Sequence, residues 1–240
     1  MTAPTTISVR GEASRTVAPD HAAFDCAVSA TPAGRDEVVS ALRAGQDAVV
    51  EGLRDLGGVV LSVDSERSDL TWSFGGPQVE DEYGRNRKTG DHGPTGRFTG
   101  RSDARILVRR LDLLDRVVAA LVAVERLELE RLDWLVDPDN PAWREVRSDA
   151  IAAALAKADD YASALGGVVR SVDHIADSGL LAGRGDNEMR VHTQSAAVAV
   201  SGVFRRGGSR GLPVVEPVPQ TIRAVVEARV RAELPDRPAN

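Results

Sequence analysis

Alternating apolar and polar positions predict strands at the two ends of the chain. Residues 7–13 and 21–31 form two short strands around a proline turn at Pro19. In the second strand every other position is apolar, and these positions are Phe24, Cys26, Val28 and Ala30. The final strand, 221–234, alternates apolar with mostly charged residues. We therefore expect it to bury one face and to leave the other in water.

A second periodicity, of three to four residues, predicts a long helix at 34–56. Its apolar stripe consists of Val38, Leu42, Val49, Leu53 and Leu56. Gly45 and Gly52 fall on the same stripe, although glycine costs about 1 kcal/mol inside a helix. Their position predicts close contact with a sheet or a neighbouring helix. Gly57 and Gly58 then end the helix.

The remaining elements follow from the same two periods. We expect helices at 111–124 and 141–165, and strands at 59–72, 97–109, 127–136 and 168–176. The segment Asp137–Pro141 is typical of a helix start, with Asp139 or Asn140 as the cap. Residues 75–96 and 179–219 lack apolar periodicity. We interpret both as long loops, the first of them an exposed hairpin loop.

Together these elements predict a mixed α+β fold. A mostly antiparallel sheet is expected to carry two long helices, 34–56 and 141–165, and one shorter helix, 111–124. One domain is expected to span 7–234, with disordered ends at 1–6 and 235–240.

A nine-residue sequence occurs twice in the chain. Leu56–Asp64 and Leu165–Asp173 are identical at every position but one. Both copies connect a predicted long helix to a predicted strand, which fits two related strand and helix units. Convergent use of one helix stop and strand start explains the match equally well, because the similarity does not extend beyond these residues.

Composition argues against several classes of protein. The 240 residues are 42% hydrophobic and 28% charged, as in soluble globular proteins. A net charge of -6 argues against nucleic acid as the main partner. No stretch approaches the ~20 apolar residues of a membrane span. Residues 1–6 lack the pattern of a secretory signal. A cytoplasmic location is therefore expected, or a periplasmic or secreted one if a signal has been removed.

The single cysteine, Cys26, excludes an intramolecular disulfide. No basic residue is adjacent in sequence to lower its pKa, so we expect a buried, unreactive thiol. Trp72, Trp134 and Trp143 are expected to anchor the core or an interface. The histidines and serines form no recognisable triad. We assign no catalytic, metal-binding or cofactor-binding residue and expect no cofactor.

The predicted loop at 75–96 carries a concentrated cluster of charge. Carboxylates at 80–82, with Asp91 and His92, are of the types that bind a divalent metal, but their spacing matches no compact metal loop. Basic residues at 85–88 lie beside them. Such mixed charge favours recognition of a protein partner or of a second copy of the chain. The candidate contact residues are Glu80, Asp81, Glu82, Arg85, Arg87 and His92.

An ordered set of landmarks resembles the SIMPL-domain family. The landmarks are the opening strand 7–13, the strand after Asp20, the helix ending in Leu56-Gly57, the segment 108–114 leading into a helix, Asp137-Pro138 before an alanine-rich helix that contains 156–158, and the closing strand 225–234. They span about residues 7 to 234. The resemblance implies helices packed on a mostly antiparallel sheet. It brings no catalytic residues.

The resemblance also carries expectations about function. Some family members are similar to periplasmic proteins that form ring-like or channel-like oligomers, and others are linked to oxidative-stress tolerance. This chain departs from them in its missing signal peptide and its charged middle loop, 75–96. The first departure puts a periplasmic role in doubt, and the second puts any shared ring geometry in doubt.

Three hypotheses of function follow. The leading one is a non-catalytic SIMPL-like protein that self-associates, with sheet edges and charged loops as the contacts. A second is a metal-dependent or small-molecule enzyme whose site lies under the loops 75–96 and 179–219. The third is a regulatory module that binds another protein through the same loops.

Overall fold

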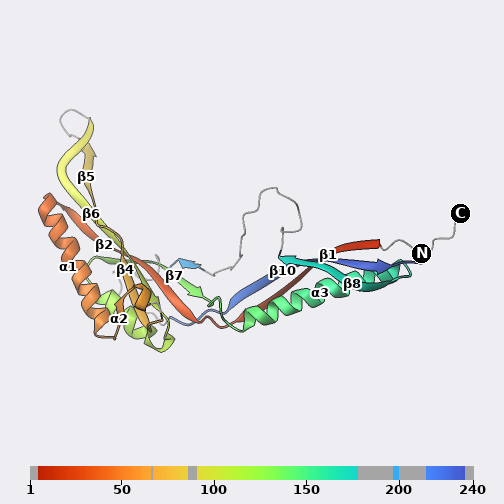
Figure 1. Cartoon of the computed structure of the whole chain (residues 1–240). Helices are drawn as coiled ribbons and strands as arrows, with labels where there is room; N and C mark the ends of the chain where they lie inside the picture. Colours follow the sequence, from red (N-terminus) through yellow and green to blue (C-terminus); the bar gives the residue numbers. More distant parts are fainter. Residues whose placement is uncertain (1–4, 66, 86–90, 178–196, 200–214, 236–240) are drawn as a thin grey trace. The chain divides into compact units, whose positions relative to one another are not determined.

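The computed structural model describes residues 5–65, 67–85, 91–177, 197–199 and 215–235 (Figure 1). It has a mixed α+β fold with three α-helices in the described residues, α1 (Arg35–Arg54), α2 (Leu114–Ala123) and α3 (Ala142–Ala164). One sheet is antiparallel, and the other contains one parallel pair. The prediction of an α+β fold with mostly antiparallel strands is confirmed.

The described chain divides into two compact units. Unit 1 combines three stretches that lie within 1–18, 137–194 and 219–240. Unit 2 combines stretches within 19–136 and 195–218. Each unit contains its own sheet and at least one helix. None of the described helices is both long and apolar enough to cross a membrane.

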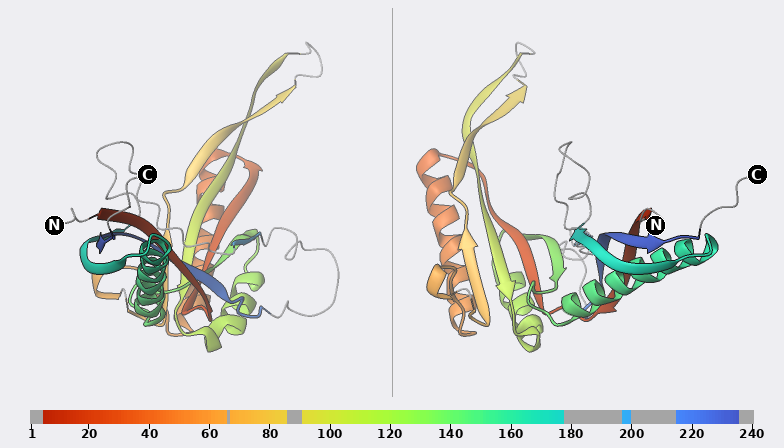
Figure 2. Two further views of the ribbon diagram at one scale, coloured as in Figure 1. Left: turned by 90° about the vertical axis from the view of Figure 1, so that its right-hand side faces the viewer. Right: turned by 45° about the vertical axis from the view of Figure 1, so that its right-hand side comes forward.

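Unit 1 is a three-stranded sheet with α3 on one face (Figure 2). Its strands are β1 (Thr5–Val17), β10 (Gln220–Glu233) and β8 (Val168–Asp177), in the order β1-β10-β8. The alternation predicted for the last strand is confirmed, since every second residue from Ile222 to Ala232 is buried and the residues between them are not. That buried face packs against α3.

Small residues bring α3 and β1 into backbone contact. The buried face of α3 consists of Trp143, Val146, Ala150, Ala154, Ala158 and Ala162. A Cβ added at Gly11 would lie 2.1 Å from the carbonyl oxygen of Ala150 and 2.4 Å from the backbone nitrogen of Ala154. No side chain therefore fits between strand and helix at this position. At the start of α3, the Asn140 side chain accepts a hydrogen bond from Ala142 N–H at 2.9 Å, as expected of a capping residue.

Unit 2 is built on a seven-stranded sheet with α1 and α2 on one face (Figure 2). Its strands are β2 (His21–Ala33), β3 (Val59–Val60), β4 (Leu70–Phe74), β5 (Gln78–Arg85), β6 (His92–Val108), β7 (Leu127–Leu135) and β9 (Ala197–Ala199). The order is β3-β4-β6-β2-β7-β9, and β5 pairs with β6. Trp72 and Trp134 are buried in its core, as predicted, and Trp143 is buried in unit 1.

Gly45 and Gly52 lie where α1 contacts β2 and α2. A Cβ at Gly45 would lie 2.4 Å from a methyl group of Val28 on β2. At Gly52 it would lie 3.4 Å from the Cβ of Ala120 on α2. The prediction that these glycines face a sheet or a neighbouring helix is confirmed for both.

Two segments differ from their sequence-based predictions. The strand predicted at 59–72 is interrupted by a short 3₁₀ helix, η1 (Val63–Ser65), because the Ser65 hydroxyl bonds to the backbone of Val60 and Ser62. The loop predicted at 75–96 contains β5 and the start of β6. Apart from Val79, Tyr83 and Phe98, the residues of that hairpin are polar, glycine or proline, so its strands leave too weak an alternating pattern to detect.

Smaller differences concern element ends. The strand β1 begins at Thr5, inside the segment expected to be disordered, and β1 and β2 each have 13 residues rather than being short. The helix predicted at 111–124 begins as a 3₁₀ turn, η2 (Leu111–Leu113). Element ends are set by pairing with distant segments, which the local pattern does not contain.

The nine-residue repeat forms the same helix stop in each unit. Gly57 and Gly166 both have positive φ angles, 81° and 76°. The N–H of the next glycine bonds to the carbonyl of the residue five positions earlier, at 2.9 Å in both copies. These are the bonds of a Schellman motif, which glycine adopts without steric strain. The two copies therefore share the helix stop, but they differ after it, since Val63 and Asp64 lie in η1 whereas Val172 and Asp173 lie in β8.

We predict that Gly11→Val destabilises the protein by about 2 kcal/mol or more, because its side chain would overlap the backbone of α3. Urea unfolding followed by circular dichroism measures the change. Gly76→Ala is the control, since a Cβ there meets nothing within 4 Å and should change stability by less than about 0.5 kcal/mol. Equal stability of the two variants would contradict the backbone contact.

Candidate functional site

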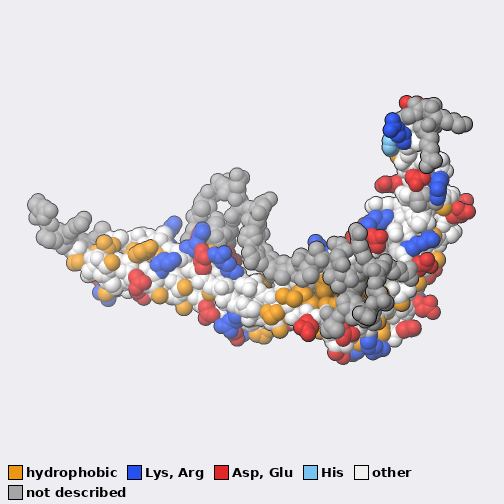
Figure 3. Space-filling model, turned by 180° about the vertical axis from the view of Figure 1, so that it is seen from behind, with side chains coloured by type: hydrophobic (Ala, Val, Ile, Leu, Met, Phe, Trp, Pro, Cys, Tyr) orange, Lys and Arg blue, Asp and Glu red, His pale blue; other side chains and the backbone are white. Residues whose placement is uncertain are grey.

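The charged residues predicted as contacts lie on the hairpin formed by β5 and β6, which extends beyond the end of α1 (Figures 1 and 2). Glu80, Asp81, Glu82 and Arg85 are on β5, and His92 begins β6. Arg87 lies outside the described residues. Figure 3 shows acidic and basic side chains mixed along this hairpin.

The hairpin does not gather its carboxylates around His92. Glu80 is opposite Thr99, Asp81 is opposite Phe98, and Arg85 is opposite His92. The Glu82 carboxylate accepts a hydrogen bond from the Thr95 hydroxyl at 2.8 Å. Across the described residues, no group of three or more His, Cys, Asp or Glu side chains is placed to hold a metal ion. Most of the second predicted loop, 179–219, lies outside the described residues.

Sequence reasoning missed a polar depression on the other face of the unit 2 sheet. Its volume is about 500 Å³. It is lined by Asp25, Cys26, Ser73, Phe74, Gly75, Arg101, Asp103, Ala104, Arg105 and Glu130. The signal was present in the sequence of β6, because Arg101, Asp103 and Arg105 occupy the positions that alternate with its buried residues.

The charged groups in and around this depression form cross-strand ion pairs. The register aligns Arg105, Asp25 and Arg131 in one row across β6, β2 and β7. Asp25 lies 2.7 Å from Arg105 and 2.6 Å from Arg131. Asp133, on the same face, lies 3.1 Å from Arg131. Opposite charges on adjacent strands stabilise a sheet by about 0.2–1 kcal/mol per pair.

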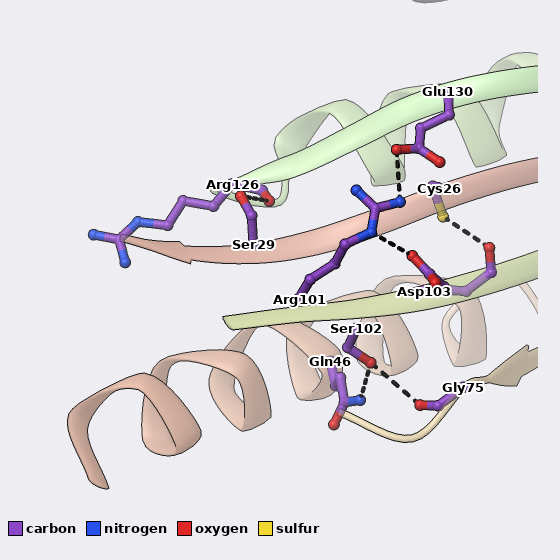
Figure 4. A network of polar contacts seen from close by, with 10 residues as sticks. Cys26, Ser29, Gln46, Gly75, Arg101, Ser102, Asp103, Arg126 and Glu130 are labelled. Atoms are coloured by element: carbon purple, nitrogen blue, oxygen red, sulfur yellow. Dashed lines mark hydrogen bonds and ion pairs between the residues drawn. The ribbon is translucent and has the colours of Figure 1, made fainter. Parts of the chain in front are cut away.

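Arg101 links a second set of carboxylates (Figure 4). Its guanidinium lies 2.7 Å from Asp103 and 2.7 Å from Glu130. The hydrogen bond to Glu130 is the main cause that raises the pKa of Arg101 above its usual value. On the core side of the same strand, the Ser102 hydroxyl accepts a hydrogen bond from Gln46 at 2.6 Å. Arg101 and Ser102 are therefore both hydrogen-bonded to other side chains of the same unit.

Cys26 is buried, and its thiol is in an unreactive form. Its side chain faces the core, and the thiol lies 3.6 Å from the carbonyl oxygen of Ala104. Burial, followed by the nearby carboxylates of Asp25, Glu130 and Asp103, raises the pKa of this thiol to about 12. A thiol with that pKa is protonated at neutral pH and is a poor nucleophile. The predicted burial of Cys26 is confirmed.

The two edges of the unit 1 sheet differ in regularity. β8 shifts register twice against β10, and the shifts leave Arg170 and Asp173 without opposite residues. These two side chains pair with Glu233 and Arg231 of β10 at 2.7 Å and 2.8 Å. β1 pairs with β10 over its full length without any shift. Among the described strands, β10 is the only one that pairs with β1.

Charged groups also follow the β1 edge. Arg10 lies 2.9 Å from Glu227 of β10, and Glu12 pairs with Arg223. From α3, the Lys157 ammonium donates a hydrogen bond to the Arg10 carbonyl oxygen at 2.8 Å. These residues were not among the sequence-predicted sites, although the prediction did include sheet edges as contacts. Which edge stays open depends on pairing between distant segments, so the local pattern does not contain it.

Comparison with known proteins adds a family match. A family model described as "SIMPL: Protein of unknown function (DUF541)" matches residues 7–230, which is nearly the whole chain. A search of curated proteins gives no significant match. The match covers parts of both units.

We predict that Ellman's reagent labels Cys26 very slowly in the native protein at about pH 8, because the thiol is buried and protonated there. Denatured protein, labelled at the same pH, is the control and should react fully. The native pKa exceeds the ordinary 9.0, so this group favours folding below pH 9 and that contribution is lost as the pH rises toward 12. Rapid labelling of folded protein would contradict the assigned environment.

Proposed function

The chain belongs to the SIMPL family, whose function is unknown, and we propose that it is a non-catalytic protein that self-associates through the open edge of β1. A role of this assembly in stress tolerance belongs to the same proposal and rests on the sequence resemblance. The partner in this proposal is a second copy of the chain.

The observation that carries the proposal is the uninterrupted edge of β1. All 13 residues of β1 pair in continuous register with β10, and no other described strand pairs with the opposite edge. An exposed, regular strand edge presents unpaired N–H and C=O groups that another chain can pair with. β8 lacks this regularity, because its two register shifts and charged residues are features that block edge pairing.

Two contacts indicate which backbone groups of β1 face outward. The Arg10 carbonyl accepts its bond from Lys157 of α3. The Thr16 and Thr221 hydroxyls, which are directly opposite each other, lie 3.4 Å apart, and such close side chains are typical of non-hydrogen-bonded pairs. Both contacts assign the outward N–H and C=O groups to the even-numbered residues. The backbone groups of Ser8, Arg10, Glu12 and Ser14 therefore lie along this edge, where the Arg10 carbonyl already accepts one bond from Lys157.

A non-catalytic role is supported by the state of the polar groups in the unit 2 depression. Its arginines are engaged by carboxylates, and the pKa of its thiol is raised. A nucleophile or general base needs the opposite environment, with a pKa shifted toward neutrality.

The hairpin of β5 and β6 favours a second candidate, docking of another protein. Its Tyr83 side chain is 65% exposed among charged neighbours. Exposed tyrosine surrounded by charge is a common feature of protein interfaces. A two-stranded ribbon is also only marginally stable on its own, so a bound partner would stabilise it.

We predict that Ser8→Pro raises the dissociation constant of the self-associated form roughly tenfold, since the variant loses one outward N–H on each copy. Analytical ultracentrifugation over a wide concentration range measures this, with circular dichroism to confirm folding.

Tyr83→Ser in the hairpin is the control and should leave self-association unchanged. If Tyr83→Ser weakens association and Ser8→Pro does not, the contact between copies lies on the hairpin instead of on β1. A wild-type protein that stays monomeric at every concentration would overturn the proposal.

A further inference from the structure

We infer that two copies pair antiparallel along β1 with Gly11 opposite Gly11 of the second copy, so that a twofold axis passes between them. This inference rests on the proposed self-association and adds its register and symmetry. The evidence comes from two independent surfaces. One is the face of β1 that points away from α3, and the other is the side of α3 that lies along β1.

The face of β1 that points away from α3 carries side chains that are self-complementary about Gly11. Its even-numbered residues, in order, are Thr6, Ser8, Arg10, Glu12, Ser14 and Thr16. In the inferred register Arg10 is opposite Glu12 of the second copy, and by symmetry Glu12 is opposite Arg10. Ser8 is opposite Ser14, and Thr6 is opposite Thr16. Opposite charges and hydroxyl pairs are favourable cross-strand neighbours.

Neighbouring registers are unfavourable for the same reason. An alternative register must differ by two residues, because a shift of one residue would turn the side chains of the second copy to the other face of the sheet. A slip in one direction places Arg10 opposite Arg10, and a slip in the other places Glu12 opposite Glu12. Like charges directly opposite destabilise a strand pair. The charge pattern therefore selects the register centred on Gly11.

The inferred pairing also extends the ion pairs already present in each copy. Arg10 is paired with Glu227, and Glu12 is paired with Arg223. Across the new strand pair, the charges would alternate in sign from Glu227 through Arg10 to Glu12 and Arg223 of the second copy. Each of the two central charges would then contact an opposite charge on both sides.

The side of α3 along β1 is self-complementary about the same point. Asp149 bonds to Arg15 of β1 at 3.1 Å, and Lys157 bonds to Arg10 at 2.8 Å, so both lie along this strand. Ala153 lies midway between them, four residues from each. Gly11 contacts α3 at Ala150 and Ala154, which places the twofold axis beside Ala153.

Two such helices would lie antiparallel across the axis. Asp149 of one copy would then be near Lys157 of the other, and the small side chain of Ala153 allows a close approach. Because α3 packs on both β1 and β10, it does not extend wholly over the open edge. The helices can therefore lie side by side at an ordinary packing distance of about 8–10 Å.

The resulting assembly closes on itself. Each copy contributes three strands in the order β1-β10-β8, so the joined sheet has β8 at both ends. Those ends carry the register shifts and charged residues that oppose further pairing. A symmetric pairing through β1 thus ends at the dimer along this sheet.

The test mixes two charge variants, R10E and E12R. Each variant alone places like charges opposite one another twice per dimer, and we expect its dissociation constant to rise roughly tenfold or more. In an equimolar mixture, one copy presents two acidic and the other two basic side chains at positions 10 and 12. The mixture should associate more tightly than either variant alone, although each copy has lost its own pair with Glu227 or Arg223, and ultracentrifugation measures this.

R170E is the matched control, because it breaks a similar ion pair with β10 at the other edge, and it should associate as the wild type does. Circular dichroism and thermal melting confirm that every variant folds. If the wild type associates but the mixture does not recover, the register is wrong while the proposed self-association stands. If the wild type itself is monomeric, both proposals fail.

Discussion

The backbone contact between Gly11 and α3 is the constraint on which the organisation of unit 1 depends. A strand and a helix that approach this closely leave no room for a side chain, and the facing positions of the helix are alanines for the same reason. The contact fixes where α3 lies along β1. It thereby positions Asp149, Ala153 and Lys157 beside the strand, in the row of side chains next to the buried stripe.

The two edge strands of the unit 1 sheet, β1 and β8, differ in regularity. β8 is interrupted twice and carries paired charges, whereas β1 is regular along its whole length. Protecting one edge while leaving the other regular is what a closed, symmetric assembly requires. In unit 2 charges on the outer face of the sheet are paired within the chain, so they contribute to the stability of the sheet.

The sequence predicted those parts of the fold that depend on local periodicity. The extents of α1 and α3, the alternation of β10 and the contacts of Gly45 and Gly52 follow from spacing within single elements. The hairpin was predicted as an exposed loop at 75–96, and its strand pairing was missed because few of its residues are apolar. The strand at 59–72 was overextended because the Ser65 hydroxyl bonds were not visible in the pattern. Candidate residues on the hairpin were identified, but they do not converge, because strand pairing places them along a ribbon. That β10 alone of the described strands pairs with β1 depends on residues more than 200 positions away, which no local pattern records.

Residue-resolved amide hydrogen exchange, measured by NMR at several protein concentrations, shows whether the outer edge of β1 is open in the monomer and paired in the dimer. Amides of the odd-numbered residues, which the contacts of Arg10 and Thr16 assign to the side of β10, should exchange slowly at every concentration. We predict that amides of Ser8, Arg10, Glu12 and Ser14 exchange rapidly in dilute protein and become protected as concentration rises. Rapid exchange of these four amides at all concentrations, in a sample that self-associates, would contradict pairing through β1.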